Sequence, residues 1–130
     1  MAQIRTKPAI FCLALLIGAA NASAEMDIVS KARMAAVEGD HVTCARLADE
    51  ARKQPGADGR VHHLYATCQA FAADTKRSKL SKAEYAAEIQ KAIDAYQFLL
   101  RTPGLLPNIE ERASVEFVIE QLQERMNAPK

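Results

Sequence analysis

The sequence predicts an all-α protein of five helices behind an N-terminal leader, and three observations support this fold class. Apolar residues recur at spacings of three and four along five segments of the chain, which is the period of an amphipathic helix. No run of alternating β-branched residues is long enough to form a convincing strand. Residues that commonly start or end helices, such as Gly39, Asp40 and Ser81, stand between the segments.

The N-terminus has the pattern of a secretory signal peptide. Arg5 and Lys7 precede an uncharged apolar run at residues 10–17, and small residues follow at positions 22–24. This pattern predicts cleavage after Ala24, so residues 1–24 are interpreted as a signal peptide. The mature chain is then expected in the periplasm or outside the cell.

Two alternatives exist for this leader. Cys12 lies inside the apolar run without the small-residue context that lipid attachment uses, so we expect it to be removed with the leader. An uncleaved membrane anchor is the other alternative, but Gly18 and Asn21 leave the span short and interrupted. We therefore expect residues 25–130 to form one domain that is not an integral membrane protein after cleavage.

The composition of the chain limits the classes of partner that it is expected to bind and indicates its redox compartment. All 16 acidic residues lie beyond Ala24 whereas Arg5 and Lys7 precede it, so cleavage moves the formal net charge from +1 to −1. This balance gives no indication of nucleic-acid binding. Of the three cysteines, Cys44 and Cys68 remain, an even pair in an oxidising compartment where disulfides form and persist.

The first two expected helices meet at a Gly-Asp break. Residues 27–38 form the first helix and Gly39 terminates it, while Asp40 caps the second helix, which stops before Pro55. The second helix carries one stripe of small and apolar residues at Cys44, Leu47, Ala48 and Ala51. This stripe is suited to close contact with neighbouring helices.

A turn at residues 55–59 leads to a third helix at residues 60–73. Its apolar positions are Val61, Leu64, Tyr65, Cys68, Phe71 and Ala72. Because Cys68 lies in the middle of this stripe, we expect it to face the core. Residues 74–81 contain three basic residues and little that could be buried, so they are predicted to form a solvated basic loop.

The start of the fourth helix is the clearest local signal. Ser81 and Glu84 form a capping box, and Leu80 and Tyr85 occupy the positions of a hydrophobic staple. The helix should continue to Arg101 and be the most buried one, because it is apolar over much of its circumference. The residues concerned are Ile89, Ala92, Ile93, Tyr96, Phe98, Leu99 and Leu100.

A fifth helix follows, with Asn108 and Glu111 as its capping residues. Its apolar stripe is formed by Val115, Val118, Ile119, Leu122 and Met126. Glu116, Glu120 and Glu124 repeat every four residues on this helix. A basic partner would compensate their repulsion, and screening by water and salt on an ordinary outer face is the alternative.

Two of these segments resemble the second helix of tetratricopeptide repeats. Residues 39–55 place Cys44 and Ala51 where the family favours small residues, and residues 92–103 match its order of small, aromatic and aliphatic residues and a closing proline. The resemblance implies two antiparallel helix hairpins plus a C-terminal capping helix. Cys44 and Ala92 are 48 residues apart, whereas the repeat has about 34, so the second hairpin must be longer. A generic helical bundle is the alternative.

The resemblance also implies a role for the cysteines and a binding face. The second helix of one unit packs against the first helix of the next, so a Cys44–Cys68 disulfide would join the two units. Tetratricopeptide-like modules bind another protein or a peptide in a concave face, formed largely by the first helices. Exposed residues of the first and third helices, namely Arg33, His62 and Gln69, are therefore candidates for partner contact.

The sequence contains no motif for catalysis, a metal or a cofactor. There is no Gly-x-Ser-x-Gly, no phosphate-binding glycine-rich loop and no HExxH motif. His62 and His63 are neighbours that point about 100° apart on a helix, so they are interpreted as partly exposed surface residues. We therefore expect a non-enzymatic, exported interaction or adaptor module without a cofactor. An immunity or inhibitor protein that blocks a delivered toxin or hydrolase is the alternative.

Overall fold

The structure, a computed structural model, describes residues 26–128, and within them helices are joined by short turns and loops without a strand. It contains five α-helices, which confirms the predicted all-α class, and one 3₁₀ turn. They are α2 (Ile28–Val37), α3 (His41–Arg52), α4 (Gly59–Lys76), η1 (Arg77–Lys79), α5 (Lys82–Arg101) and α6 (Ile109–Asn127). The predicted signal peptide and Cys12 lie outside the described residues.

Side-chain caps fix where the helices begin. The N-cap residues, whose side chains accept backbone N–H bonds of the first turn, are Asp27, Asp40, Asp58, Ser81 and Asn108. The capping box is complete: Ser81 N–H donates to Glu84 Oε1 at 3.0 Å, and Glu84 N–H donates to Ser81 Oγ at 3.1 Å. Gly39, with φ +82°, makes the sharp break between α2 and α3.

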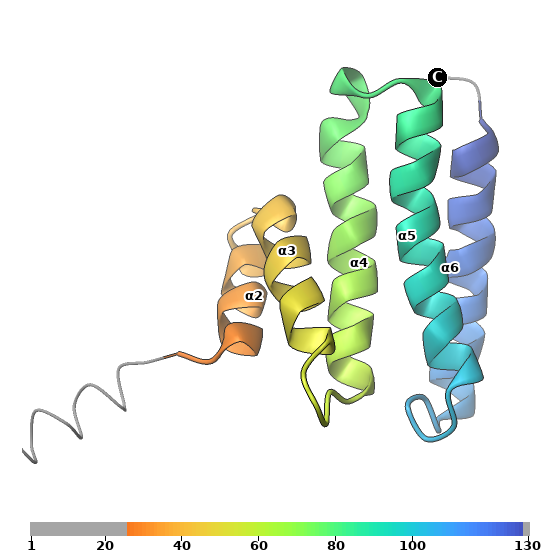
Figure 1. Cartoon of the computed structure of the whole chain (residues 1–130). Helices are drawn as coiled ribbons and strands as arrows, with labels where there is room; N and C mark the ends of the chain where they lie inside the picture. The colour runs from red at the N-terminus through yellow and green to blue at the C-terminus, as the bar shows by residue number, and fades with distance from the viewer. Residues whose placement is uncertain (1–25, 129–130) are drawn as a thin grey trace, which may run out of the picture.

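Each helix lies beside the next one in the chain (Figure 1). The pairs α2–α3 and α4–α5 form hairpins, and α6 packs on α5. One apolar cluster runs through all five helices, with Ala32, Cys44, Tyr65, Ile89 and Val115 as buried members. The helices therefore share one continuous core. No helix in the described part of the chain has the length and apolar character to cross a bilayer.

A disulfide joins the two hairpins. Cys44 of α3 and Cys68 of α4 are bonded, with their Cα atoms 5.8 Å apart. Their exposed fractions are 0% and 2%, so the bond lies in the core. The predicted pairing of these two cysteines is confirmed.

The expectation of a solvated basic loop at residues 74–81 is wrong. Helix α4 continues into this segment and η1 follows directly. Asp74 anchors it, because one carboxylate oxygen accepts the Tyr85 hydroxyl at 2.6 Å and the other pairs with Arg125 at 2.7 Å. The guanidinium of Arg77 lies over the Tyr85 ring, 4.6 Å from its centroid. Contacts with α5 and α6 thus order a segment whose charged sequence predicts a solvent-exposed loop.

Two aromatic residues assigned to the core stripes are half-exposed instead. Phe71 and Phe98 expose 50% and 45% of their surface. Each packs against a histidine: Phe71 stacks on His41, and Phe98 meets His62 at a tilt of 45°, both with ring centroids 4.8 Å apart. They shield these imidazoles from water at the edges of the core.

Candidate functional site

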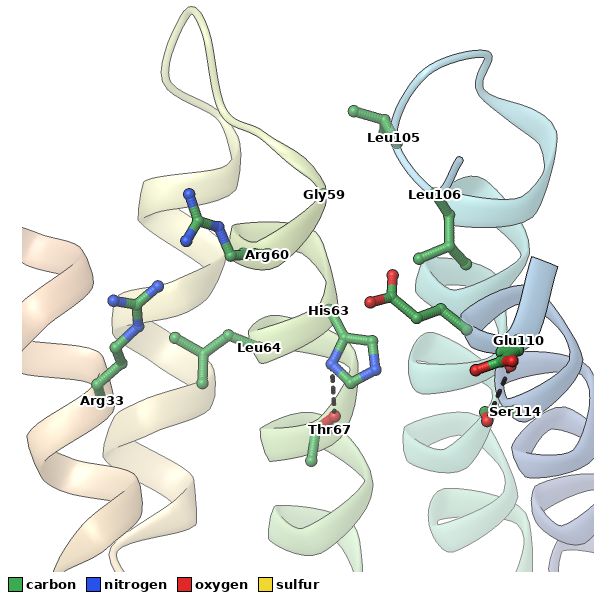
Figure 2. Close-up of a pocket in the computed structure, with 11 residues that line it drawn as sticks. Arg33, Gly59, Arg60, His63, Leu64, Thr67, Leu105, Leu106, Glu110 and Ser114 are labelled. Atoms are coloured by element: carbon green, nitrogen blue, oxygen red, sulfur yellow. Dashed lines mark hydrogen bonds between the residues drawn. The ribbon is translucent and has the colours of Figure 1, made fainter. Parts of the chain in front are cut away.

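A groove of about 710 Å³ is lined by α4, with α2 on one side and the start of α6 on the other (Figure 2). Helix α4 supplies its centre through Arg60, His63, Leu64 and Thr67, which follow each other at helical spacings and share one face. Arg33 of α2 borders it on one side, and the first turns of α6 border it on the other. The groove is thus built from alternate helices of the chain.

Tyr96 of α5 contacts two of the residues that line the groove, Thr67 and His63. Its hydroxyl and the Thr67 hydroxyl are 2.8 Å apart, and the His63 ring meets the Tyr96 ring edge-on with centroids 5.7 Å apart. His63 Nδ1 lies 3.5 Å from Thr67 Oγ1. Partial burial among these neighbours lowers the pKa of His63, which favours its neutral form. Burial also raises the pKa of Tyr96.

The loop between α5 and α6 closes one end of the groove. Gly59, the first residue of α4, lies so close to this loop that a Cβ atom there would overlap the Leu105 carbonyl oxygen. Arg112 holds the loop from the other side by donating to the Leu106 carbonyl at 3.2 Å and to the Leu100 carbonyl at 3.0 Å. The apolar side chains of this loop are therefore fixed relative to α4.

The wall formed by α6 is acidic. Asn108 caps the helix by accepting the N–H groups of Glu110 at 2.8 Å and Glu111 at 3.2 Å. Both glutamates therefore lie in the first turn, where the helix dipole favours negative charge. The Glu111 carboxylate is near enough to His63 to oppose, in part, the lowering of its pKa.

Only one of the three predicted partner-contact residues lies in this groove. Arg33 is exposed and lines it. The expectation that His62 and Gln69 are exposed is wrong, because they expose 9% and 7% of their surface. Gln69 donates to the Glu88 carbonyl at 3.1 Å and to Glu88 Oε2 at 2.6 Å, while the His62 ring packs at a tilt against the Phe98 ring. Both side chains connect α4 to α5.

Most residues that line the groove were not predicted from the sequence. On α4, Arg60, His63 and Thr67 are spaced three and four residues apart, so the sequence places them on one face of the helix. Leu64, beside them, was assigned to the core stripe instead. On α6, no local signal marks Glu110 and Ser114, since only the packing of α6 on α5 turns them toward α4. The polar face of α4 was therefore the sequence signal that could have indicated the groove.

No group of three or more His, Cys, Asp or Glu side chains within residues 26–128 is arranged to hold a metal ion. No protein-family model, curated protein or solved structure matches the chain. The function is therefore inferred from the groove and its charges.

Proposed function

We propose that this protein is an exported, non-enzymatic interaction module that binds a segment of another protein in the groove between α2, α4 and α6. The observation that carries the proposal is the groove itself, whose volume of about 710 Å³ is in the range of binding sites and which has charged walls around an apolar and hydroxyl-bearing centre. The resemblance of two segments to tetratricopeptide repeats is consistent with this use, because such arrays bind through a concave face. The Cys44–Cys68 bond supports a periplasmic or secreted location, where disulfides persist.

The polar groups of the groove favour binding over a reaction. A nucleophile and its base need a short hydrogen bond of about 2.6–3.2 Å, with a third group orienting the base. His63 and Thr67 are 3.5 Å apart, and the Thr67 hydroxyl is engaged by Tyr96. No carboxylate among residues 26–128 accepts a hydrogen bond from His63. We therefore propose that these groups bind a partner rather than catalyse a reaction.

Site-specific photo-crosslinking in the native cell envelope tests this proposal. A photoreactive residue at Ser114, on the α6 side of the groove, should crosslink to a partner protein. The matched control is Ala87, which is exposed on α5 and does not line the groove. Equal crosslinking at both positions, or none at Ser114, would contradict the proposal.

A second candidate function is inhibition of one delivered toxin or hydrolase, as an immunity protein does. The observation in its favour is the face of α6 carrying Glu116, Glu120 and Glu124, which are exposed and form no ion pair within residues 26–128. The two arginines of α6 are engaged elsewhere: Arg112 bonds backbone carbonyls and Arg125 pairs with α4. An unpaired acidic face suits a basic partner surface.

Co-purification separates the two functions. A single basic enzyme recovered in stoichiometric amount would favour the inhibitor, and several envelope-assembly proteins would favour the adaptor. For an inhibitor, changing Glu116, Glu120 and Glu124 together to Gln should slow association about tenfold or more at low salt. An unchanged association rate would remove this candidate.

A further inference from the structure

The two sides of the groove carry opposite charges. Arg33 of α2 and Arg60 of α4 form the basic side, and Figure 2 shows both on the same side of the groove as Leu64. Within residues 26–128, Arg60 pairs only with Asp58, at 3.6 Å, and this pair is largely exposed. Arg33 forms no ion pair with any residue between 26 and 128. Both arginines are therefore available to a carboxylate on a bound molecule.

The α6 side provides the complementary charge. Glu110 and Glu111 face the groove, and in the described part of the chain neither forms an ion pair. Between the two sides lie the neutral groups of His63 and Thr67, with Leu105 and Leu106 at the end. A ligand that spans the groove thus meets positive charge on one flank, negative charge on the other and no net charge between them.

We propose that the groove binds an extended peptide segment in which acidic and basic side chains alternate. In an extended chain successive side chains point to opposite sides. Acidic side chains would then face Arg33 and Arg60 while their basic neighbours face Glu110 and Glu111. A segment of one charge sign would be attracted by one flank and repelled by the other. This inference rests on the proposed function and names the chemistry of the bound segment.

A binding measurement with two isomeric peptides tests the alternation. The probe is a fluorescent, end-blocked peptide of alternating Glu and Lys, and the control has the same composition with all Glu before all Lys. Fluorescence anisotropy with the oxidised protein at low salt should give a dissociation constant about tenfold lower or more for the alternating peptide. Equal affinities, or no binding of the alternating peptide, would overturn the inference.

Charge reversal provides a second test, because an alternating peptide can satisfy exchanged flanks by shifting its register by one residue. Arg33→Glu with Arg60→Glu, or Glu110→Lys with Glu111→Lys, should each weaken binding about tenfold or more. All four changes together should restore it. Loss of binding in the fourfold variant, with circular dichroism and thermal unfolding unchanged, would contradict the register argument.

Neutral variants keep the inference testable if the charge-reversal variants misfold. Arg33→Gln with Arg60→Gln should also weaken the alternating peptide, and unchanged affinity there would overturn the inference. Equal competition by the free dipeptide of Glu and Lys would also overturn it, by indicating a site for a small zwitterion. If Ser114 crosslinks to a partner but the two peptides bind alike, the inference fails while the proposed function stands. If Ser114 crosslinks to nothing as well, both fail.

Discussion

At the scale of single residues, Gly59 occupies a position where a Cβ atom would overlap the backbone of Leu105. Its α carbon faces the Leu105 carbonyl, so Gly59→Ala would force α4 and the α5–α6 loop apart at the end of the groove. Alanine normally stabilises a helix relative to glycine, but overpacking costs about 1–3 kcal/mol. We expect the free energy of unfolding to fall by that amount in urea titrations. The control Ala87→Ser should change it by less than about 0.5 kcal/mol, and a stabilised Gly59→Ala protein would contradict the contact.

His62 makes a prediction about pH. Burial lowers its pKa, the charge of Arg52 adds to this effect, and Asp58 opposes it. The unfolded chain therefore binds this proton more readily, with a pKa of about 6.5. The free energy of unfolding is then highest above that pH and decreases as pH falls through it. Urea unfolding between about pH 7.5 and 5.5, above the range where carboxylates titrate, measures this dependence.

The variant His62→Gln provides the comparison for that measurement. It should show a weaker dependence on pH over the same range, since the remaining part comes from His63, whose pKa is lowered by burial in the same direction. A dependence as steep as that of the unmodified protein would mean that His62 does not titrate as described.

Single residues also show what sequence reasoning could and could not find. Cys44 and Cys68 were paired correctly, because they are the only two cysteines outside the predicted signal peptide and so leave one intramolecular pairing. Arg33 is exposed as expected, whereas His62 and Gln69 are buried. His62 and Gln69 were expected to be exposed because their side chains are polar. Their burial follows from partners on α5: Phe98 is 36 residues from His62, and Glu88 is 19 residues from Gln69.

At the scale of helices, the start of α5 is set by its capping box. Ser81→Ala removes the acceptor for the Glu84 N–H, and loss of an N-cap costs about 0.5–2 kcal/mol. Urea unfolding should show a decrease in this range. Lys82→Ala, at the exposed next position, should have little effect. Equal stability of the Ser81→Ala protein would show that the cap contributes nothing to the fold.

Helix boundaries were predictable where the signal is local. The starts at Asp40, Ser81 and Asn108 follow from cap residues and agree with the structure. The end of α4 was placed too early, because Asp74 is stabilised by Tyr85 and Arg125, and these contacts depend on the packing of α5 and α6. The α6 side of the groove was missed for the same physical reason.

At the scale of the whole molecule, the disulfide joins the first hairpin to the second. It closes a loop with a sequence separation of 24, which should stabilise the fold by about 3–4 kcal/mol in the chain-entropy model. That is a large fraction of a typical stability of about 5–15 kcal/mol. Cys44→Ala with Cys68→Ala should lose about this amount in urea unfolding. A loss below about 1 kcal/mol would mean that core packing alone holds the hairpins together.

We propose that this chain is exported and that the disulfide fixing α3 against α4 forms in that compartment. Intact mass spectrometry of the protein isolated from cells, with and without reductant, tests it most directly. We predict a chain that begins at Glu25 and gains the mass of two protons on reduction. A chain that retains its N-terminal leader, or a mass that does not change on reduction, would contradict the claim.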